Sequence, residues 1–157
     1  MDYFLNEGRL RPTNAAVALI TVGERPHYLM QLRDQKSGIF FPGHWGLFGG
    51  AIDPGEAPEI TLRRELKEEL HLEAPEPTYF TEFQFDFSFC GYGRLIRRCY
   101  EVRIADSALP KLVLGEGADM RVFSAAEILT RSRVAPYDAL AIWLHASRHS
   151  TLKANQD

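Results

Sequence analysis

The distribution of apolar residues predicts two central strands near the start of the chain. Residues 15–22 form a continuous apolar and β-branched run, and residues 28–32 form a second one. Short runs of this kind are typical of strands that are buried on both faces. Residues 23–26 include a glycine and a proline, which favour a hairpin connection. We therefore expect these two strands to lie in the middle of a sheet.

A strict two-residue alternation predicts a second hairpin in the middle of the chain. Four phenylalanines are separated by single residues, and they are Phe83, Phe85, Phe87 and Phe89. An extended strand places such residues on one face, and that face suits a protein core better than a platform on which bases stack. Residues 94–104 alternate in the same way, and Gly91 and Gly93 favour a turn between the two strands.

A leucine spacing of one helical turn predicts a helix between the two hairpins. The leucines are Leu62, Leu66 and Leu70. Pro58 suits the first turn because its missing N–H costs little there, although Ala57 before it supplies no side-chain cap. Pro75 prevents the helix from extending far beyond residue 72.

The last third of the chain predicts a loop, a strand and two helices. Residues 112–119 read as a loop, and residues 120–123 as a strand. Ser124 and Glu127 have the spacing of a capping box, which predicts a short helix. A longer helix is expected over residues 136–149. The side chains that it is expected to bury are Leu140, Trp143 and Leu144.

This order of elements predicts one α+β domain in which helices cover a mixed sheet. The chain has 157 residues, of which 45% are hydrophobic, and this is ample for a sizeable core. Residues 1–13 show no clear period and fit a flexible arm, an edge strand or a partner contact. Residues 151–157 are expected to form a flexible tail.

Composition and charge narrow the class of function. A net charge of −3 argues against general nucleic-acid binding, because no basic surplus is present to neutralise a phosphate backbone. No apolar run is long enough to span a bilayer. Cys90 and Cys99, without an apparent secretory leader, indicate reduced thiols rather than a disulfide. We therefore expect a cytoplasmic protein that acts on a small molecule, and a homodimer is left open.

The acidic residues of the predicted helix suggest a metal site. Glu65, Glu68 and Glu69, with Arg64 beside them, occupy the arc next to the leucines. Glu65 and Glu69 are one turn apart, and their repulsion costs a few tenths of a kcal/mol unless a cation intervenes. Carboxylate oxygens suit Mg²⁺ or Mn²⁺, which completes its shell with water and substrate phosphates. For an arbitrary acidic run, a solvated charged face is the commoner interpretation.

The residues upstream of the acids favour the metal site. Gly50, Glu56 and the run RELKEELHL at 64–72 resemble the signature of the Nudix hydrolase family. Every specified position matches except His71, where the family has glycine, the residue best able to end a helix in the left-handed conformation. A histidine there costs up to about 1 kcal/mol and removes no metal ligand.

The resemblance implies an α/β/α sandwich with a mixed sheet that hydrolyses, with Mg²⁺, a nucleoside diphosphate linked to another moiety. Mn²⁺ is a possible substitute for Mg²⁺. The metal ligands it implies are the side chains of Glu65, Glu68 and Glu69 and the carbonyl of Gly49. The ions would neutralise the diphosphate and acidify the attacking water.

Further roles follow from the same resemblance. Glu56 is expected to pair with Arg64 and so orient the loop against the helix. Glu116, in a downstream loop, or a motif glutamate is expected to act as general base, and a solvated turn residue is the alternative for Glu116. Arg33 follows a strand and is a candidate for binding a substrate phosphate, with ordinary solvation as its alternative. Gly50 permits close backbone approach to a ligand.

Several alternatives stay open. Nucleotide sugars, oxidised nucleoside triphosphates and ADP-ribose all fit the predicted chemistry, and a non-catalytic nucleotide-sensing module is the second class of function. An isomerase of isoprenoid diphosphates would need histidine and cysteine positions that the sequence does not supply. His145 and His149 have the spacing of a zinc pair, but without a third ligand a solvated helix end is favoured.

Overall fold

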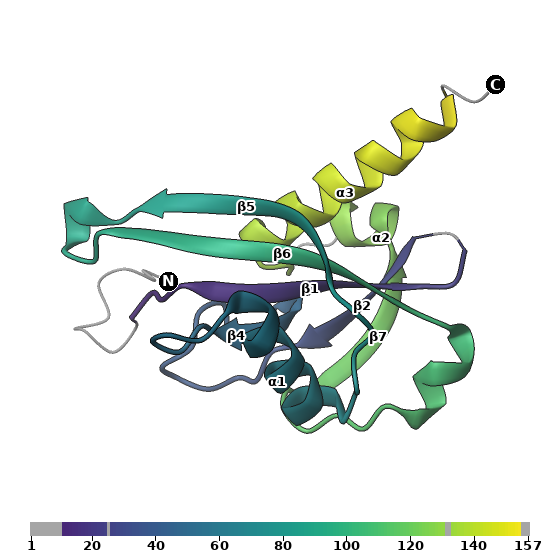
Figure 1. The fold of residues 1–157 in the computed structure, drawn as a ribbon, viewed down its shortest axis with the longest axis horizontal. Helices are drawn as coiled ribbons and strands as arrows, with labels where there is room; N and C mark the ends of the chain where they lie inside the picture. The colour runs from purple at the N-terminus through teal and green to yellow at the C-terminus, as the bar shows by residue number, and fades with distance from the viewer. Residues whose placement is uncertain (1–10, 25, 131–132, 155–157) are drawn as a thin grey trace.

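A mixed sheet forms the centre of the molecule (Figure 1). The computed structural model describes residues 11–24, 26–130 and 133–154. The seven strands within these ranges are β1 (Ala15–Val22), β2 (His27–Leu32), β3 (Trp45–Gly46), β4 (Phe48–Ala51), β5 (Thr78–Asp86), β6 (Arg94–Ile104) and β7 (Asp119–Ser124). β1 pairs in parallel with β6 and antiparallel with both β2 and β4. The predicted central position of β1 is therefore confirmed.

Helices cover both faces of this sheet (Figure 1). They are α1 (Pro58–Leu70), α2 (Ala125–Thr130) and α3 (Pro136–Ala154), with short 3₁₀ turns η1 (Ser88–Cys90) and η2 (Asp106–Lys111). α1 lies on one face, whereas α2 and α3 lie on the other. The predicted α+β fold, an α/β/α sandwich with a mixed sheet, is confirmed.

The apolar run of β1 supplies both halves of the core, because successive strand residues point to opposite faces. Ala16, Ala18 and Ile20 pack toward α1 and its three buried leucines. Val17 and Leu19 pack toward Ala141 and Ile142 of α3. Burying a leucine side chain contributes roughly 1.5–3 kcal/mol, so the leucine stripe attaches the acidic face of α1 firmly to the sheet.

The two ends of α1 match the expectations from its sequence. Ala57 makes no side-chain cap, and its carbonyl accepts the first helical hydrogen bonds from the amides of Ile60 and Thr61. His71 ends the helix in the left-handed region, with φ 51° and ψ 30°. Its amide donates to Lys67 O, and Leu72 N donates to Leu66 O. His71 thus performs the turn that glycine performs more easily.

The long hairpin differs from its prediction at its outer end. β5 begins at Thr78 and stops at Asp86, and Phe87 leads into the η1 turn. The aromatic row is not a core face along its whole length, because Phe89 is 78% exposed. The reason is visible in Figure 1, where the tip of the hairpin extends past the helices that cover the rest of the sheet.

The C-terminal helix also differs from its prediction. α3 buries Ala141, Ile142 and His145, whereas Leu140 and Trp143 are 45% and 52% exposed. The helix is turned so that smaller residues meet the sheet. It continues to Ala154, so residues 151–154 are helical rather than a tail. Residues 1–10 and 155–157 lie outside the described part of the chain, and 11–14 have no regular secondary structure.

Two further expectations bear on the surroundings of the protein. Cys99 is buried and carries a free thiol. Within the described residues, no helix is both long and apolar enough to cross a membrane.

Candidate active site

Two glycines bring β4 against its neighbours at the start of the site. A Cβ atom on Gly49 would lie 2.3 Å from the carbonyl oxygen of Ala16 on β1, and Gly49 has φ +128°. A Cβ atom on Gly50 would lie 2.4 Å from the carboxyl carbon of Glu65. Position 49 therefore requires glycine, because backbone atoms would clash with a Cβ atom there, whereas at position 50 a Cβ atom would displace the end of the Glu65 side chain. The group that approaches Gly50 closely is the Glu65 carboxylate, which explains the paired glycines without a ligand.

Arg64 holds the loop before α1 against the helix. Its Nε and Nη2 donate to the two carboxylate oxygens of Glu56 at 3.2 and 3.0 Å, and its Nη1 donates to Glu65 Oε1 at 2.7 Å. Thr61 Oγ1 also donates to Glu56, at 2.6 Å. Hydrogen bonds from Arg64 and then Thr61 lower the pKa of Glu56 to about 2. Glu56 is therefore ionised, and its predicted pairing with Arg64 is present.

Glu69 is the buried acid of the site. Its exposed fraction is 5%. Gly49 N donates to its Oε2 at 2.9 Å, and Gln31 Nε2 donates to its Oε1 at 3.4 Å. Burial raises its pKa to about 8, and the charge of Glu65 adds to that rise. Burial also raises the pKa of Glu65, although the bond from Arg64 opposes the rise.

These acids line one cleft together with the loop that contains Glu116. The cleft has a volume of about 410 Å³, and Glu65, Glu69 and Glu116 all line it. Gly115 N donates to Glu69 O at 2.7 Å, and a Cβ atom on Gly115 would lie 2.4 Å from Glu68 O. The absence of a side chain at Gly115 therefore lets the loop dock on the end of α1 and place Glu116 beside the motif.

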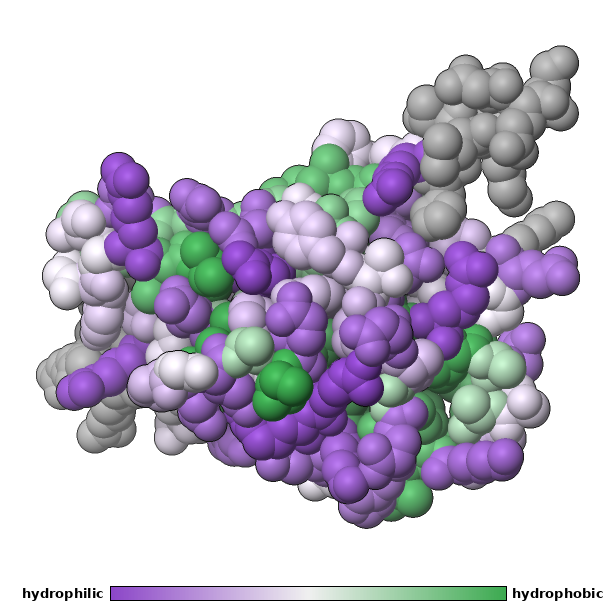
Figure 2. All heavy atoms as spheres, viewed as in Figure 1, coloured by the Kyte–Doolittle hydropathy of each residue, from purple (hydrophilic) through white to green (hydrophobic). Residues whose placement is uncertain are grey.

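The outer acids are arranged differently. The Glu68 side chain is 62% exposed and lies 3.6 Å from Arg64 Nη1. The Glu116 side chain is 60% exposed, and its Oε1 lies 3.4 Å from Lys36 Nζ. Figure 2 shows that hydrophilic side chains gather over the region of α1. Glu68 and Glu116 therefore belong to the solvated rim of the site, whereas Glu65 and Glu69 form its inner part.

The chemistry of the inner acids fits a hard divalent cation. Both offer oxygen donors, and burial raises the pKa of both carboxyl groups. In the described ranges, no three acidic, histidine or cysteine side chains converge into a ready metal cage. Mg²⁺ is commonly bound through one or two carboxylates, with water and substrate phosphates completing its shell. Glu65 and Glu69 match that pattern.

A second, more apolar pocket adjoins the cleft. It has a volume of about 250 Å³ and shares a wall with the cleft. The shared residues are Arg33, Gly49, Gly50 and Ala51. Arg33 Nε donates to Phe40 O at 2.8 Å, which fixes the guanidinium between the two spaces. A ligand with a ring and a charged chain can therefore occupy both.

The sequence profile described as "NUDIX domain" matches residues 11–144. The chain belongs to the NUDIX domain family. The predicted family is thus confirmed over most of the chain.

Known relatives of this NUDIX domain match it over a short segment. The nucleoside triphosphatase NudI of Salmonella agona is 48% identical over 44 residues, which are 28% of this chain and 30% of that protein. NudI of Salmonella arizonae is 49% identical over 43 residues, again 30% of its length. The match thus spans less than a third of the relatives.

Solved structures show the same NUDIX fold over nearly the whole chain. The MutT protein from Methanosarcina mazei Go1 has a TM-score of 0.68 at 21% identity, over 90% of this chain and 96% of that one. The NUDIX domain of Shewanella oneidensis NrtR, complexed with ADP ribose, has a TM-score of 0.68 at 20% identity, over 88% of this chain and 90% of that one.

Sequence reasoning missed several groups that the NUDIX site contains. Gln31 and Thr61 bond the acids but carry no motif of their own. The small pocket was also missed, although the alternation that puts Phe85 and Phe87 on one face could have indicated it. The interpretation of His145 as part of a solvated helix end was wrong. It is 1% exposed and lies 2.9 Å from both Tyr28 Oη and Glu101 Oε2, whereas the His149 side chain lies outside the described part.

Proposed function

We propose that the chain hydrolyses the pyrophosphate bond of a nucleoside diphosphate linked to another moiety, with Mg²⁺ as its cofactor and Mn²⁺ as a substitute. The observation that carries the proposal is the shared wall between the two spaces. One space gathers Glu65, Glu69 and Glu116, and the other is lined by aromatic rings. A nucleotide has the matching division, with phosphates at one end and a flat ring at the other.

We assign the metal ligands and a phosphate-binding residue of this reaction as follows. Glu65 and Glu69, with Glu68 and the Gly49 carbonyl, would hold Mg²⁺, which neutralises the diphosphate and lowers the pKa of the attacking water when it is bound. Arg33 binds a phosphate at the shared wall.

Two groups complete the mechanism. The Arg64–Glu56 pair keeps the glutamates of α1 in place, since Arg64 spans the loop and the helix. Glu116 accepts the proton of the water as general base, because it lines the same cleft and its side chain is 60% exposed.

The comparisons support the hydrolase class without choosing the substrate. The family match covers residues 11–144, and the curated relatives named above are nucleoside triphosphatases. A related NUDIX domain is complexed with ADP ribose. These compounds share a nucleotide and a phosphate anhydride, which is the class that we propose for this chain.

A non-catalytic nucleotide-sensing module is the second candidate. The observation that favours it is that the acids do not converge into a complete metal cage within the described residues. Against it stands Glu69, whose burial with only neutral donors costs stability. A sensor would bind nucleotides without hydrolysing them.

Chromatographic detection of the nucleoside monophosphate product tests the proposal. A panel of nucleoside triphosphates, nucleotide sugars and ADP-ribose is incubated with and without Mg²⁺, and we expect the monophosphate to form only with the metal. Glu69→Gln should lower kcat by at least about 10²-fold. Glu73→Gln is the matched control, because Glu73 lies just past α1 with an 82% exposed side chain. Full Mg²⁺-dependent activity in Glu69→Gln would refute the assignment of this ligand.

A further inference from the structure

Gln31 is a polar residue at a position of β2 that faces the core. The alternation of the strand places Leu29 against α1, and Gln31, two residues further on, lies on the same face. Its exposed fraction is 4%. An amide at such a position costs stability unless hydrogen bonds replace its contacts with water. The hydrogen-bond partners of this amide therefore indicate its use.

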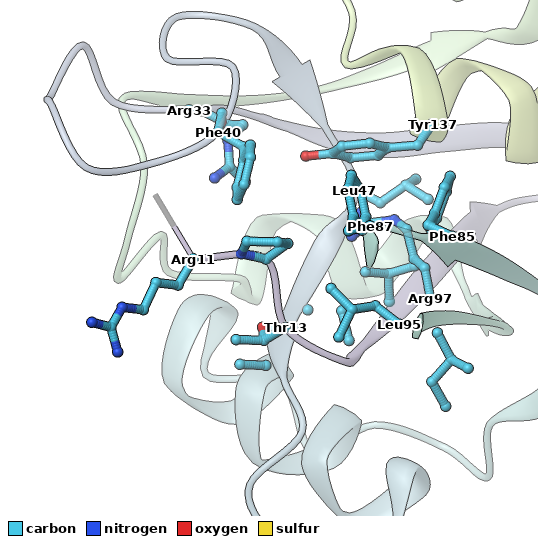
Figure 3. Close-up of a pocket in the computed structure, with 17 residues that line it drawn as sticks. Arg11, Thr13, Arg33, Phe40, Leu47, Phe85, Phe87, Leu95, Arg97 and Tyr137 are labelled. Carbon is cyan, nitrogen blue, oxygen red and sulfur yellow. The ribbon is translucent and has the colours of Figure 1, made fainter. Parts of the chain in front are cut away.

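One partner of the amide is the backbone of Leu47, next to β4. Gln31 Nε2 donates to Leu47 O at 3.2 Å. Leu47 is held in turn, because its amide donates to Asp138 Oδ2 at 3.0 Å, and its side chain lines the small pocket beside the cleft (Figure 3). Gln31 is thus tied to a fixed backbone segment, which carries Gly49 two residues later.

The other partner is the buried acid of the cleft. Gln31 Nε2 donates to Glu69 Oε1 at 3.4 Å, and Gly49 N donates to Glu69 Oε2 at 2.9 Å. The last torsion of a glutamate side chain has only a broad preference, so a donor at each oxygen restricts how the carboxylate plane can turn. A carboxylate has about four lone-pair sites. Both oxygens can therefore still bind a cation.

Gln31 also contacts the loop that carries Glu116. A Cβ atom on Gly117 would lie 3.1 Å from Gln31 Oε1. Ala118 N donates to the carbonyl of Leu32, the neighbour of Gln31 in β2, at 2.8 Å. Gln31 lines the acid cleft as well. It therefore lies between the acids of α1 and the loop of the proposed general base.

We propose that Gln31 is a positioning residue that holds the Glu69 carboxylate in the orientation in which it receives the divalent cation. The proposal rests on the proposed function, because it takes Glu69 as a ligand of Mg²⁺. A side chain that hydrogen-bonds a metal ligand orients that ligand, and its removal typically lowers metal affinity by about 10–100-fold. Gln31 acts on the metal through Glu69.

Binding of Mn²⁺ alone, without nucleotide, tests this role. Free Mn²⁺ is measured by electron paramagnetic resonance while the ion is titrated into the protein. Gln31→Met keeps the length of the side chain but removes the amide, and it should raise the Kd for Mn²⁺ by about 10–100-fold. Gln84→Met is the matched control, because Gln84 Nε2 also donates to a carboxylate, Glu82 Oε1 at 3.2 Å, but on the exposed part of β5. Its Kd should stay within about twofold of the wild type.

A double-mutant cycle separates positioning from a general effect on the fold. If Gln31 acts through Glu69, Gln31→Met should change the Kd of Glu69→Gln protein by less than about twofold, although it costs the wild type about tenfold or more. Gln31→Asn is the second variant. It keeps an amide but draws it back from Glu69 by one methylene, so it should weaken Mn²⁺ binding in the same way. Thermal unfolding without metal checks that each variant is folded.

The kinetics of hydrolysis give an independent measurement. In Gln31→Met, the Mg²⁺ concentration for half-maximal rate should rise by about tenfold or more. The KM for the nucleotide at saturating Mg²⁺ should stay within about twofold of the wild type. A residue that served the fold alone would not shift the Mg²⁺ requirement.

These measurements distinguish failure of this inference from failure of the proposed function. Mn²⁺ binding that depends on Gln31 through Glu69, without hydrolysis of any nucleotide by the wild type, would support the positioning role and refute the hydrolase. Hydrolysis by the wild type together with unchanged Mn²⁺ binding in the folded Gln31 variants would refute the inference and leave the hydrolase standing. Hydrolysis together with an equal loss of Mn²⁺ affinity with and without the Glu69 carboxylate would do the same.

Discussion

The two faces of the sheet bury charged groups in opposite ways. On the α3 side, Asp138 has a side chain that is 2% exposed, and it is neutralised by Arg97 and by an amide of the chain. His145 lies between Tyr28 and Glu101 on the same side. On the α1 side, Glu69 is almost as buried, and among the described residues its carboxylate accepts hydrogen bonds from the neutral donors Gly49 N and Gln31 Nε2 alone.

This difference distinguishes buried charged residues that stabilise the fold from buried charged residues that are suited to bind a ligand. A buried charge with a partner of opposite sign can be retained by the folded protein alone, whereas a buried charge without one weakens it. Perturbed carboxylates of the second kind cluster at functional sites. Breaking the Asp138 ion pair should therefore lower the free energy of unfolding, whereas removing the Glu69 charge should raise the free energy of unfolding of the metal-free protein.

The largest predicted effect is loss of the compensated pair. Asp138→Ala leaves the Arg97 guanidinium buried without its anion, and we expect it to lower the free energy of unfolding by about 3–5 kcal/mol. Urea denaturation of the two proteins measures the difference. Arg97→Met combined with Asp138→Asn should cost much less, since no charge is stranded. Equal costs for the single and double variants would show that the pair is not held by charge.

The opposite sign is predicted for Glu69→Gln in metal-free protein. The folded pKa of Glu69 is raised to about 8, above its unfolded value. Its contribution to stability is then fully present below the unfolded pKa and is lost as the pH rises through about 8. The glutamine variant keeps the buried contacts without that loss. We expect it to be more stable than the wild type by roughly 1–3 kcal/mol at pH 9.

A chemical denaturation series from pH 5 to pH 9, in the presence of a chelator, measures this effect. The wild type should lose stability with rising pH relative to Glu69→Gln, and the two should approach each other near pH 5. Glu73→Gln again serves as the control, with no such divergence. A wild type that stays the more stable protein at pH 9 would mean that the Glu69 charge is compensated after all.

Mg²⁺ should reverse that ranking by supplying the missing positive charge. At free metal of ten to a hundred times Kd, binding to the folded state adds about 1.4–2.7 kcal/mol. The unfolding temperature of the wild type at pH 8 should therefore rise with Mg²⁺, and that of Glu69→Gln should rise less. Ca²⁺ and Na⁺ at matched ionic strength are the controls. An equal rise in the unfolding temperature of the two proteins would show that Glu69 does not contribute to metal binding.

The fold was readable from the sequence where burial is regular. The apolar residues of β1 and the leucines of α1 are buried along the whole length of their elements. The periodicity of the sequence is therefore enough to predict these elements and their buried faces. The prediction failed at Phe89 and Trp143, which are apolar but exposed. Periodicity shows which residues share a face, but whether a neighbour covers that face depends on tertiary packing.

The candidate site was only partly readable. The acids of α1 and the Glu56–Arg64 pair follow from fixed spacing within one segment. Gln31 of β2 contacts Glu69 of α1, and Arg97 of β6 contacts Asp138 of α3. Each contact joins distant elements, so no local pattern marks it. Glu116 was placed by its position in a glycine loop, and its cleft location is consistent with the role that we propose for it.

The smallest predicted effect tests whether stability of α1 can change without touching the site. His71 ends the helix with φ 51°, a conformation that glycine adopts without a Cβ penalty. His71→Gly should therefore stabilise the protein by up to about 1 kcal/mol. Because the cap adds no charge to the cleft, the gain should be equal at pH 6 and pH 9 and equal with and without Mg²⁺, unlike that of Glu69→Gln. Thermal unfolding under these four conditions measures it. A gain that depends on Mg²⁺ would mean that the helix end and the metal site move together.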